Sequence, residues 1–198
     1  MTLFTQAATH DTVASPLLRT KLCVQGKPEL EVGCDAGQWL TERALRYKER
    51  TFVGIECSSR ARTAHNRAAR MGLANVDIIE GDAHAFVCRW RREPVFSSIY
   101  VLFPTPYPRS LGYSRRLVTV QFLDGLARLA APGAILRIAT DHTSYFKAIE
   151  SAVFSSVWDR VPWQPVEGVR RGYLVDTPCE RRYREAGCDI HALSCISR

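Results

Sequence analysis

The sequence predicts an α/β fold in which a parallel, doubly wound sheet is covered by helices. Short apolar runs typical of buried strands alternate with stretches of helical spacing along most of the chain. Glycines at 33 and 37 follow the first apolar run, where folds of this class turn from a strand into a helix and bind nucleotide-like ligands. Strands separated by helices imply right-handed crossovers and therefore a parallel sheet.

The individual elements follow from these patterns. Strands are expected at 29–33, 51–56, 76–82, 98–103 and 134–141. Helices are expected at 38–47, 60–72, 115–130 and 144–154, and a short helix is expected to end at Trp90. Ser58 or Ser59 is expected to cap the helix at 60–72, and Pro132 and Gly133 to end the helix at 115–130. The tail 189–197 is a candidate sixth strand, and 172–175 is a weaker one.

Length and composition favour one compact domain. With 198 residues, 46% of them hydrophobic, the chain can bury a substantial core. We expect a single domain over 28–198, preceded by an N-terminal segment, 1–27, that can be flexible. That segment lacks the charged and apolar regions of a leader peptide, and no stretch is long enough to span a membrane, so a cytoplasmic location is expected. Seven cysteines without a CxxC pair predict reduced thiols and no metal site.

The charge pattern favours a polyanionic partner. The net charge is +7, and 23 of the 27 basic residues are arginines. Arginine makes bidentate contacts with phosphate and stacks on bases, which suits nucleic acid. The arginines form four clusters, at 89–92, 115–116, 170–171 and 181–184.

The first turn and three acids indicate the kind of cofactor. The turn "EVGCDAG" lacks the GxGxxG spacing of a dinucleotide site, and Asp35 would repel a diphosphate, which disfavours an NAD-dependent enzyme. Glu56 closes the second strand and suits two ribose hydroxyls, while Asp82 follows the third strand and suits an adenine amino group. Glu31 can order the turn or face an ammonium group. Each acid alone can be a solvated strand end; together they predict S-adenosylmethionine.

The segment "FPTPYPR", 103–109, follows the fourth strand and carries three prolines. Proline continues neither a helix nor a sheet ladder and favours extended geometry in the residue before it. The segment is therefore expected to leave the sheet as a rigid, extended arm that presents Thr105, Tyr107 and Arg109 on one side. A plain surface turn, with Tyr107 packed for stability alone, is the alternative.

Taken in order, the motifs "LEVG", "GIE", "GDA", "FPTPYPR", "RR", "ATD" and "TPCER" resemble those of the bacterial tRNA (guanine-N7-)-methyltransferases. The resemblance extends from about Leu30 to Ser194. It implies a Rossmann-like class I methyltransferase fold, mostly parallel with an antiparallel last strand. It also implies methyl transfer from S-adenosylmethionine to N7 of a guanosine in the variable loop of tRNA, with tRNA as the partner. The sequence leaves the oligomeric state open, and a monomer is favoured.

The resemblance also assigns roles to residues. Cofactor binding falls to Glu31, Glu56 and Asp82, together with the turn glycines Gly33 and Gly37; substrate binding to Arg109, Asp141, Thr177, Pro178, Cys179 and Glu180; RNA contact to Arg115 and Arg116; and the catalytic position to Thr105. Local alternatives exist. Asp141 can cap a helix, with Thr143 and Ser144 as rivals, Thr177 and Glu180 fit a capping box, and the arginine pair fits a solvated helix start.

Three positions depart from the family pattern. Asp35 stands where the family has a further glycine, and Arg109 where it usually has lysine. Thr105 replaces the aspartate of the family's FPDPW motif, the assigned catalytic position. Threonine accepts a hydrogen bond but carries no charge, so we expect a slower enzyme. The second hypothesis is a catalytically impaired homologue that binds RNA or S-adenosylmethionine without turnover.

Overall fold

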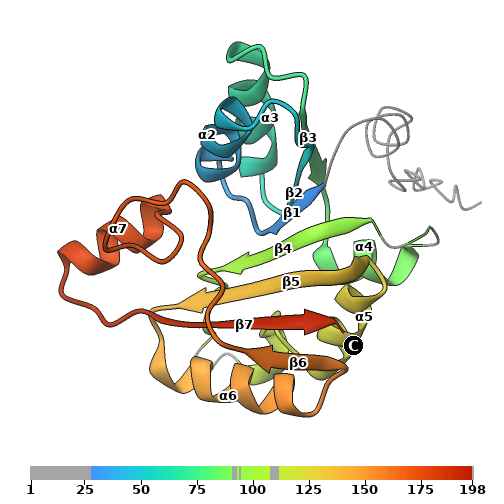
Figure 1. The fold of residues 1–198 in the computed structure, drawn as a ribbon, viewed down its shortest axis with the longest axis vertical. Helices are drawn as coiled ribbons and strands as arrows, with labels where there is room; N and C mark the ends of the chain where they lie inside the picture. Colours follow the sequence, from blue (N-terminus) through green and yellow to red (C-terminus); the bar gives the residue numbers. More distant parts are fainter. Residues whose placement is uncertain (1–27, 91–92, 94, 108–111, 198) are drawn as a thin grey trace, which may run out of the picture.

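A computed structural model describes residues 28–90, 93, 95–107 and 112–197 (Figure 1). The predicted N-terminal segment, 1–27, lies outside the described residues. Seven strands form one sheet in the order β3-β2-β1-β4-β5-β7-β6. Five are parallel neighbours: β1 (Glu29–Val32), β2 (Phe52–Glu56), β3 (Val76–Glu80), β4 (Phe96–Leu102) and β5 (Ala130–Thr140). The last strand, β7 (His191–Ser197), is antiparallel to both β5 and β6 (Trp158–Val161), which confirms the predicted fold class.

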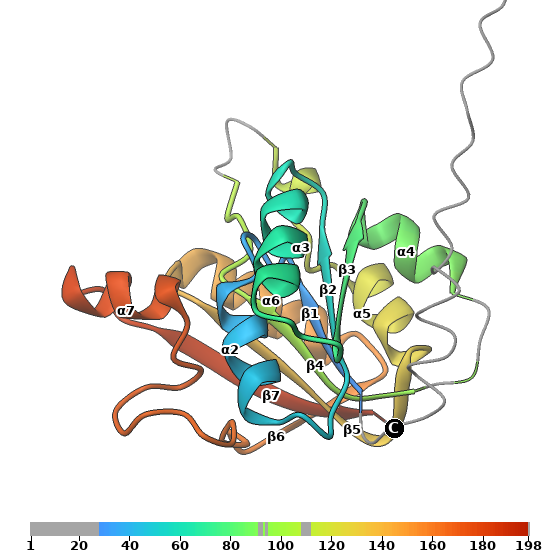
Figure 2. The ribbon, with the colours of Figure 1, turned by 90° about the horizontal axis from the view of Figure 1, so that it is seen from above.

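Helices cover both faces of the sheet. On one face lie α2 (Gln38–Arg46) and α3 (Arg60–Arg70); on the other lie α4 (Ala83–Arg89), α5 (Val120–Ala127) and α6 (Thr143–Phe154) (Figure 2). A short 3-10 turn, η2 (Tyr113–Arg115), precedes α5. The last helix, α7 (Pro178–Glu185), covers neither face and stands beyond the carboxyl ends of β4 and β5 (Figure 1). It therefore stands at the edge where folds of this class bind ligands.

The alternation of side chains along β1 determines which residues face the main core and which face α2. Leu30 and Val32 point into the main core, together with Tyr145 and Ile149 of α6. Successive strand residues point to opposite faces, so Glu29 and Glu31 face the α2 side. The Glu29 carboxylate pairs there with the guanidinium of Arg43 on α2, at 2.8 Å. The charge of Glu29 is thus neutralised inside the fold, whereas Glu31 lies nearer the carboxyl end of the strand.

The bounds predicted for the fourth helix, 115–130, are wrong at both ends. The helix α5 spans only Val120–Ala127, and Thr119 caps it by accepting a hydrogen bond from the Phe122 N–H at 3.2 Å. Pro132 and Gly133 do not end the helix, because they lie inside β5. From Phe96 to Ser98 in β4 the paired residue in β5 advances from Ala130 to Ile135, so β5 bulges. A bulge tolerates a proline and a glycine of φ 75° within a strand.

Two further differences concern the C-terminal third. The segment 172–175 is a loop, so the weaker strand prediction is wrong. The strand β6 was not predicted because Asp159 and Arg160 at its centre are exposed and leave no apolar run. At the start of α3, Ser59 is the cap residue, and the Ser58 hydroxyl accepts from the Arg60 N–H at 3.2 Å. None of the helices in the described part of the chain is both long and apolar enough to cross a membrane.

Candidate active site

The Glu31 carboxylate is buried at the carboxyl end of β1. Its residue is 5% exposed, and its Oε2 atom is buried with no hydrogen-bond partner among the described residues. Burial raises the pKa of the Glu31 carboxyl to about 8; Arg43 opposes the rise, whereas the carboxylates of Asp35 and Glu56 add to it. An unpaired buried carboxylate oxygen costs free energy. A cationic or hydrogen-bond-donating ligand would remove that cost.

The Glu56 carboxylate joins the turns that follow β1 and β2. It accepts hydrogen bonds from the backbone N–H of Asp35 at 3.0 Å and of Ser58 at 2.8 Å. An ionised carboxylate has about four acceptor positions, so Glu56 retains capacity for a ligand hydroxyl. Sequence reasoning predicted the ligand role of this residue but not its role in ordering the first turn.

The turn between β1 and α2 depends on left-handed backbone conformations. Gly33 has φ 78° and Gly37 has φ 69°. A Cβ on Gly37 would lie 2.7 Å from the Cβ of Ala64 on α3, so a side chain there would separate the two helices. Asp35 has φ 49°, a region that side chains rarely adopt. Its carboxylate pairs with the Arg60 guanidinium at 2.9 Å, an exposed contact that sequence reasoning missed.

Asp82 lies between β3, which ends at Glu80, and α4. It is the N-cap of α4, with Oδ1 accepting from the Ala85 N–H at 2.8 Å. The residue is exposed. Its other carboxylate oxygen can therefore face a ligand at the same edge as Glu31 and Glu56.

The proline arm leaves β4 by turning. Phe103 has φ 53° and Tyr107 has φ 31°, so the prediction of a continuously extended arm is wrong. The Phe103 N–H donates to the Ala139 carbonyl of β5 at 2.7 Å, which fixes the base of the arm between the two strands. Thr105 is exposed beyond that anchor. The predicted substrate residue Arg109 lies outside the described residues.

Arg116 supports the arm from inside the protein. It is 6% exposed, and its Nε donates to the Pro106 carbonyl at 2.7 Å. Its guanidinium also lies 4.5 Å from the centre of the Tyr145 ring on α6. Burial of this kind argues against direct RNA contact by Arg116. Arg115 is exposed, and RNA contact by this residue stays a prediction.

Asp141 follows β5 and is not the cap of α6. His142 is the cap, with Nδ1 accepting from the Tyr145 N–H at 3.2 Å, so the alternatives at Asp141, Thr143 and Ser144 are wrong. The carboxylate of Asp141 is half-buried and is not used by the cap. It is available to a ligand at the carboxyl end of β5.

The start of α7 brings Cys179 to the same edge. Thr177 caps the helix by accepting from the Glu180 N–H at 3.0 Å, with Pro178 in the first turn as predicted. Burial is the main reason why the pKa of the Cys179 thiol is raised. The carboxylates close enough to add to that rise belong to Asp35, Glu31 and Asp141. The Cys179 thiol therefore lies near the predicted cofactor residue Glu31 and the predicted substrate residue Asp141.

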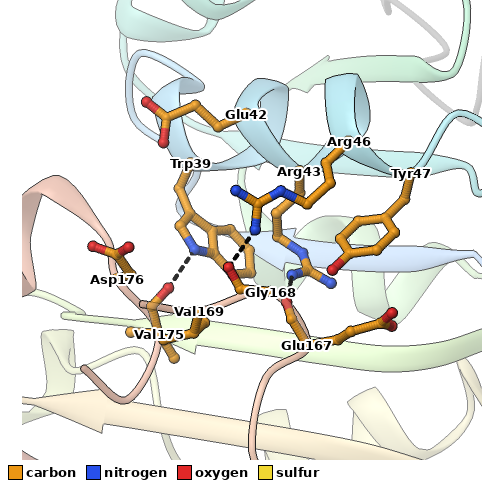
Figure 3. A pocket seen from close by; sticks show the side chains of 10 residues that line it. All are labelled: Trp39, Glu42, Arg43, Arg46, Tyr47, Glu167, Gly168, Val169, Val175 and Asp176. Carbon is orange, nitrogen blue, oxygen red and sulfur yellow. Dashed lines mark hydrogen bonds between the residues drawn. The ribbon is translucent and has the colours of Figure 1, made fainter. Parts of the chain in front are cut away.

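Sequence reasoning missed how α2 binds the loop before α7. Residues 167–169 and 175–176 of that loop lie against one side of α2 and line a hollow with it (Figure 3). The Trp39 indole N–H donates to the Val175 carbonyl at 2.6 Å, and Arg43 Nη1 donates to the Glu167 carbonyl at 3.0 Å. Trp39 and Arg43 are four residues apart and therefore lie on one face of α2. The signal available in the sequence was Arg43, a charged residue that shares the helical spacing of the buried positions of α2.

The fold, with carboxylates at the ends of β1 and β2 and after β3, is that of a class I methyltransferase. The crystal structure of the 16S rRNA methyltransferase KamB is 20% identical, with a TM-score of 0.65, covering 93% of this chain and 94% of that one. A SAM dependent methyltransferase from Aquifex aeolicus is 15% identical, with a TM-score of 0.59, covering 92% and 88%. At such identities the likeness shows the fold alone.

Sequence comparison identifies the family. Residues 25–161 match the family described as "Putative methyltransferase". The tRNA (guanine-N(7)-)-methyltransferase of Nitrosomonas eutropha is 32% identical over 171 residues, which cover 83% of this chain and 73% of the relative. This chain belongs to the tRNA (guanine-N(7)-)-methyltransferase family. The relative of the same name from Nitrosococcus oceani is 33% identical over 131 residues, 65% of this chain and 55% of its own length. The chain thus spans little more than half of that relative.

Proposed function

We propose that this protein transfers the methyl group of S-adenosylmethionine to N7 of a guanosine in the variable loop of tRNA. The observation that carries the proposal is the buried Oε2 atom of Glu31 at the carboxyl edge of the sheet, which has no hydrogen-bond partner in the part of the chain that the structure describes. A positively charged methyl donor fits that oxygen, whereas a diphosphate does not. The family of the chain supports the choice of reaction and substrate.

The three predicted cofactor carboxylates can divide the cofactor between them. Glu31 faces the positive end, Glu56 accepts from ribose hydroxyls with the capacity its backbone contacts leave free, and Asp82 accepts from the adenine amino group. When bound, S-adenosylmethionine supplies a methyl group activated by a sulfonium. The protein then has to hold guanine N7 in line with that methyl group.

Guanine N7 carries a free lone pair at neutral pH, so no general base is needed. The N7–carbon bond forms as the carbon–sulfur bond breaks, and positive charge moves from sulfur to the base. Alignment of the reactants can contribute about 7 kcal/mol in favourable cases. A carboxylate beside the base can stabilise the developing charge by roughly 3 kcal/mol. Thr105 lacks that charge, and Asp141 is the residue we propose to supply part of it.

The proposed tRNA partner is supported by exposed arginines. In the part of the chain that the structure describes, Arg115, Arg171 and Arg182 are exposed and form no ion pair with an acid. Arginine side chains in that state are the ones available to phosphates. Affinity that rests on phosphate contacts falls steeply with salt. A flat salt dependence of tRNA binding would contradict this part of the proposal.

The test is transfer of labelled methyl groups to an unmodified tRNA transcript, with the nucleosides identified by mass spectrometry. We expect 7-methylguanosine. The control transcript carries adenosine in place of the variable-loop guanosine and should accept no methyl group. Tight tRNA binding without any methylated nucleoside would overturn the proposal and favour the catalytically impaired homologue, which Thr105 makes the second candidate.

A further inference from the structure

Glu180 on α7 is completely buried and uses its carboxylate within the protein. Its exposed fraction is 0%. Oε1 accepts hydrogen bonds from the Leu174 N–H at 2.8 Å and from Arg184 Nε at 2.8 Å. Oε2 accepts from the Val175 N–H at 2.9 Å and the Asp176 N–H at 2.8 Å. These are four hydrogen bonds to one carboxylate.

This arrangement leaves Glu180 no capacity for a substrate. An ionised carboxylate offers about four acceptor positions, and all of them are taken here. The predicted capping box is also only half formed, because Glu180 accepts from the three residues before Thr177 rather than from Thr177 itself. The role implied for Glu180 by family resemblance, substrate binding, therefore does not fit the geometry.

The backbone that Glu180 holds is the end of the loop 167–176, which we call the strap. Asp176, its last residue, has φ 58°, a conformation that needs support in a residue with a side chain. The strap is also bound to α2 by three side chains, each of which donates a hydrogen bond to a backbone carbonyl of the strap (Figure 3). The pairs are Trp39 with Val175, Arg43 with Glu167 and Arg46 with Gly168. The strap thus connects α7 to the helix that begins at the cofactor turn.

We propose that Glu180 is a positioning residue: it fixes the strap to the start of α7 and so holds α7, with Cys179, over the carboxyl edge of the sheet. The part of this inference that concerns tRNA binding rests on the function proposed above. A carboxylate is required at this position because three converging backbone N–H groups and a guanidinium all donate to it. In glutamine, one end of the side chain would be a donor facing donors.

The first test needs no substrate. Hydrogen exchange of the backbone amides of 174–176 is measured in the free protein for Glu180→Gln and for the matched control Glu185→Gln, an exposed acid on the same helix. We expect exchange of these amides at least tenfold faster in the first variant and unchanged in the second. Unchanged exchange in Glu180→Gln would overturn the proposal. Because the measurement is made without tRNA, failure of the proposed function leaves its result standing.

The second test separates positioning from direct contact and remains available if Glu180→Gln does not fold. Trp39→Phe removes the indole N–H that holds Val175 but leaves the Glu180 carboxylate in place. If α7 is positioned by the strap, Trp39→Phe should raise the KM for tRNA about threefold and Glu180→Gln about tenfold or more, with the Kd for S-adenosylmethionine within about twofold of the parent. A normal KM for tRNA in Trp39→Phe would overturn the proposal.

Discussion

The Nε atom of Arg116 donates a hydrogen bond to the Pro106 carbonyl oxygen at 2.7 Å, and this contact fixes the arm that presents Thr105. Two arginines that are adjacent in the sequence thereby acquire different tasks. Arg116 lies inside the protein against the arm, and Arg115 lies on the surface. Their separate effects can be measured.

Arg116→Ala should slow methyl transfer by about tenfold to a hundredfold, because small errors in the alignment of reacting groups are costly. It should also destabilise the protein by about 1–3 kcal/mol, since it removes a buried hydrogen-bond donor. Arg115→Ala is the matched control: we expect weaker tRNA binding, a shallower salt dependence and an unchanged single-turnover rate at saturating tRNA. Equal effects of the two variants on that rate would contradict the assignment.

Thr105→Asp should accelerate methyl transfer. A carboxylate beside the base is worth roughly 3 kcal/mol in comparable sites. Because we propose that Asp141 supplies part of that charge, we expect a gain of about tenfold. Thr105→Asn is the control of similar shape without charge and should give no gain. Single-turnover rates at saturating S-adenosylmethionine provide the comparison. A lower or unchanged rate for Thr105→Asp would show that charge at this position does not limit the reaction.

The Asp35→Gly variant should be more stable toward unfolding than the Asp35→Ala variant. Both variants remove the exposed ion pair with Arg60, which is worth only about 0–1 kcal/mol. Only glycine relieves the left-handed conformation of φ 49°, and that strain is worth about 1 kcal/mol or more. Urea denaturation of the two variants measures the difference. Greater stability of the alanine variant would contradict backbone strain at position 35.

Ionisation of Glu31 should couple cofactor affinity to pH. Burial raises its pKa to about 8 in the free protein, above the ordinary 4.5, so between these values the folded protein binds more protons than the unfolded chain. Stability contributed by this group therefore falls as pH rises from about 4.5 to 8. A cationic ligand favours the ionised form, so affinity for S-adenosylmethionine should rise over the same range, with a proton released on binding.

Calorimetry in buffers of different ionisation enthalpy measures that proton release. Glu31→Gln should abolish it, and Glu42→Gln, an exposed acid on α2, should leave it unchanged. Affinity that is independent of pH in the parent protein would show that Glu31 does not face the positive group.

The positions of the five parallel strands along the chain could be predicted from the sequence because each buried strand is a short apolar run with polar residues at its end. The strand β6 lacked that signal, since Asp159 and Arg160 are exposed. Pro132 and Gly133 were interpreted as a helix end because local rules do not reveal that a bulge lets β5 accept them. The antiparallel direction of β7 came from family resemblance and is confirmed.

The site was predictable in part for the same reason. Glu31, Glu56 and Asp82 are each recognisable as residues at the ends of strands, and parallel strands bring such ends to one edge. The partners of Arg116 and Glu180 were not predictable. A solvated helix start and a capping box are local patterns, whereas these side chains are bound by Pro106 and by the strap. The roles proposed for the site residues toward cofactor and RNA stay predictions.

The measurement that tests methylation at N7 most directly uses two tRNA transcripts differing in one atom. One carries guanosine at the variable-loop target, and the other carries 7-deazaguanosine, in which carbon replaces N7. With S-adenosylmethionine and this protein, the first should yield 7-methylguanosine and the second should accept no methyl group while binding equally well. Methylation of the 7-deaza transcript, or no methylation of either, would contradict guanine N7 as the acceptor.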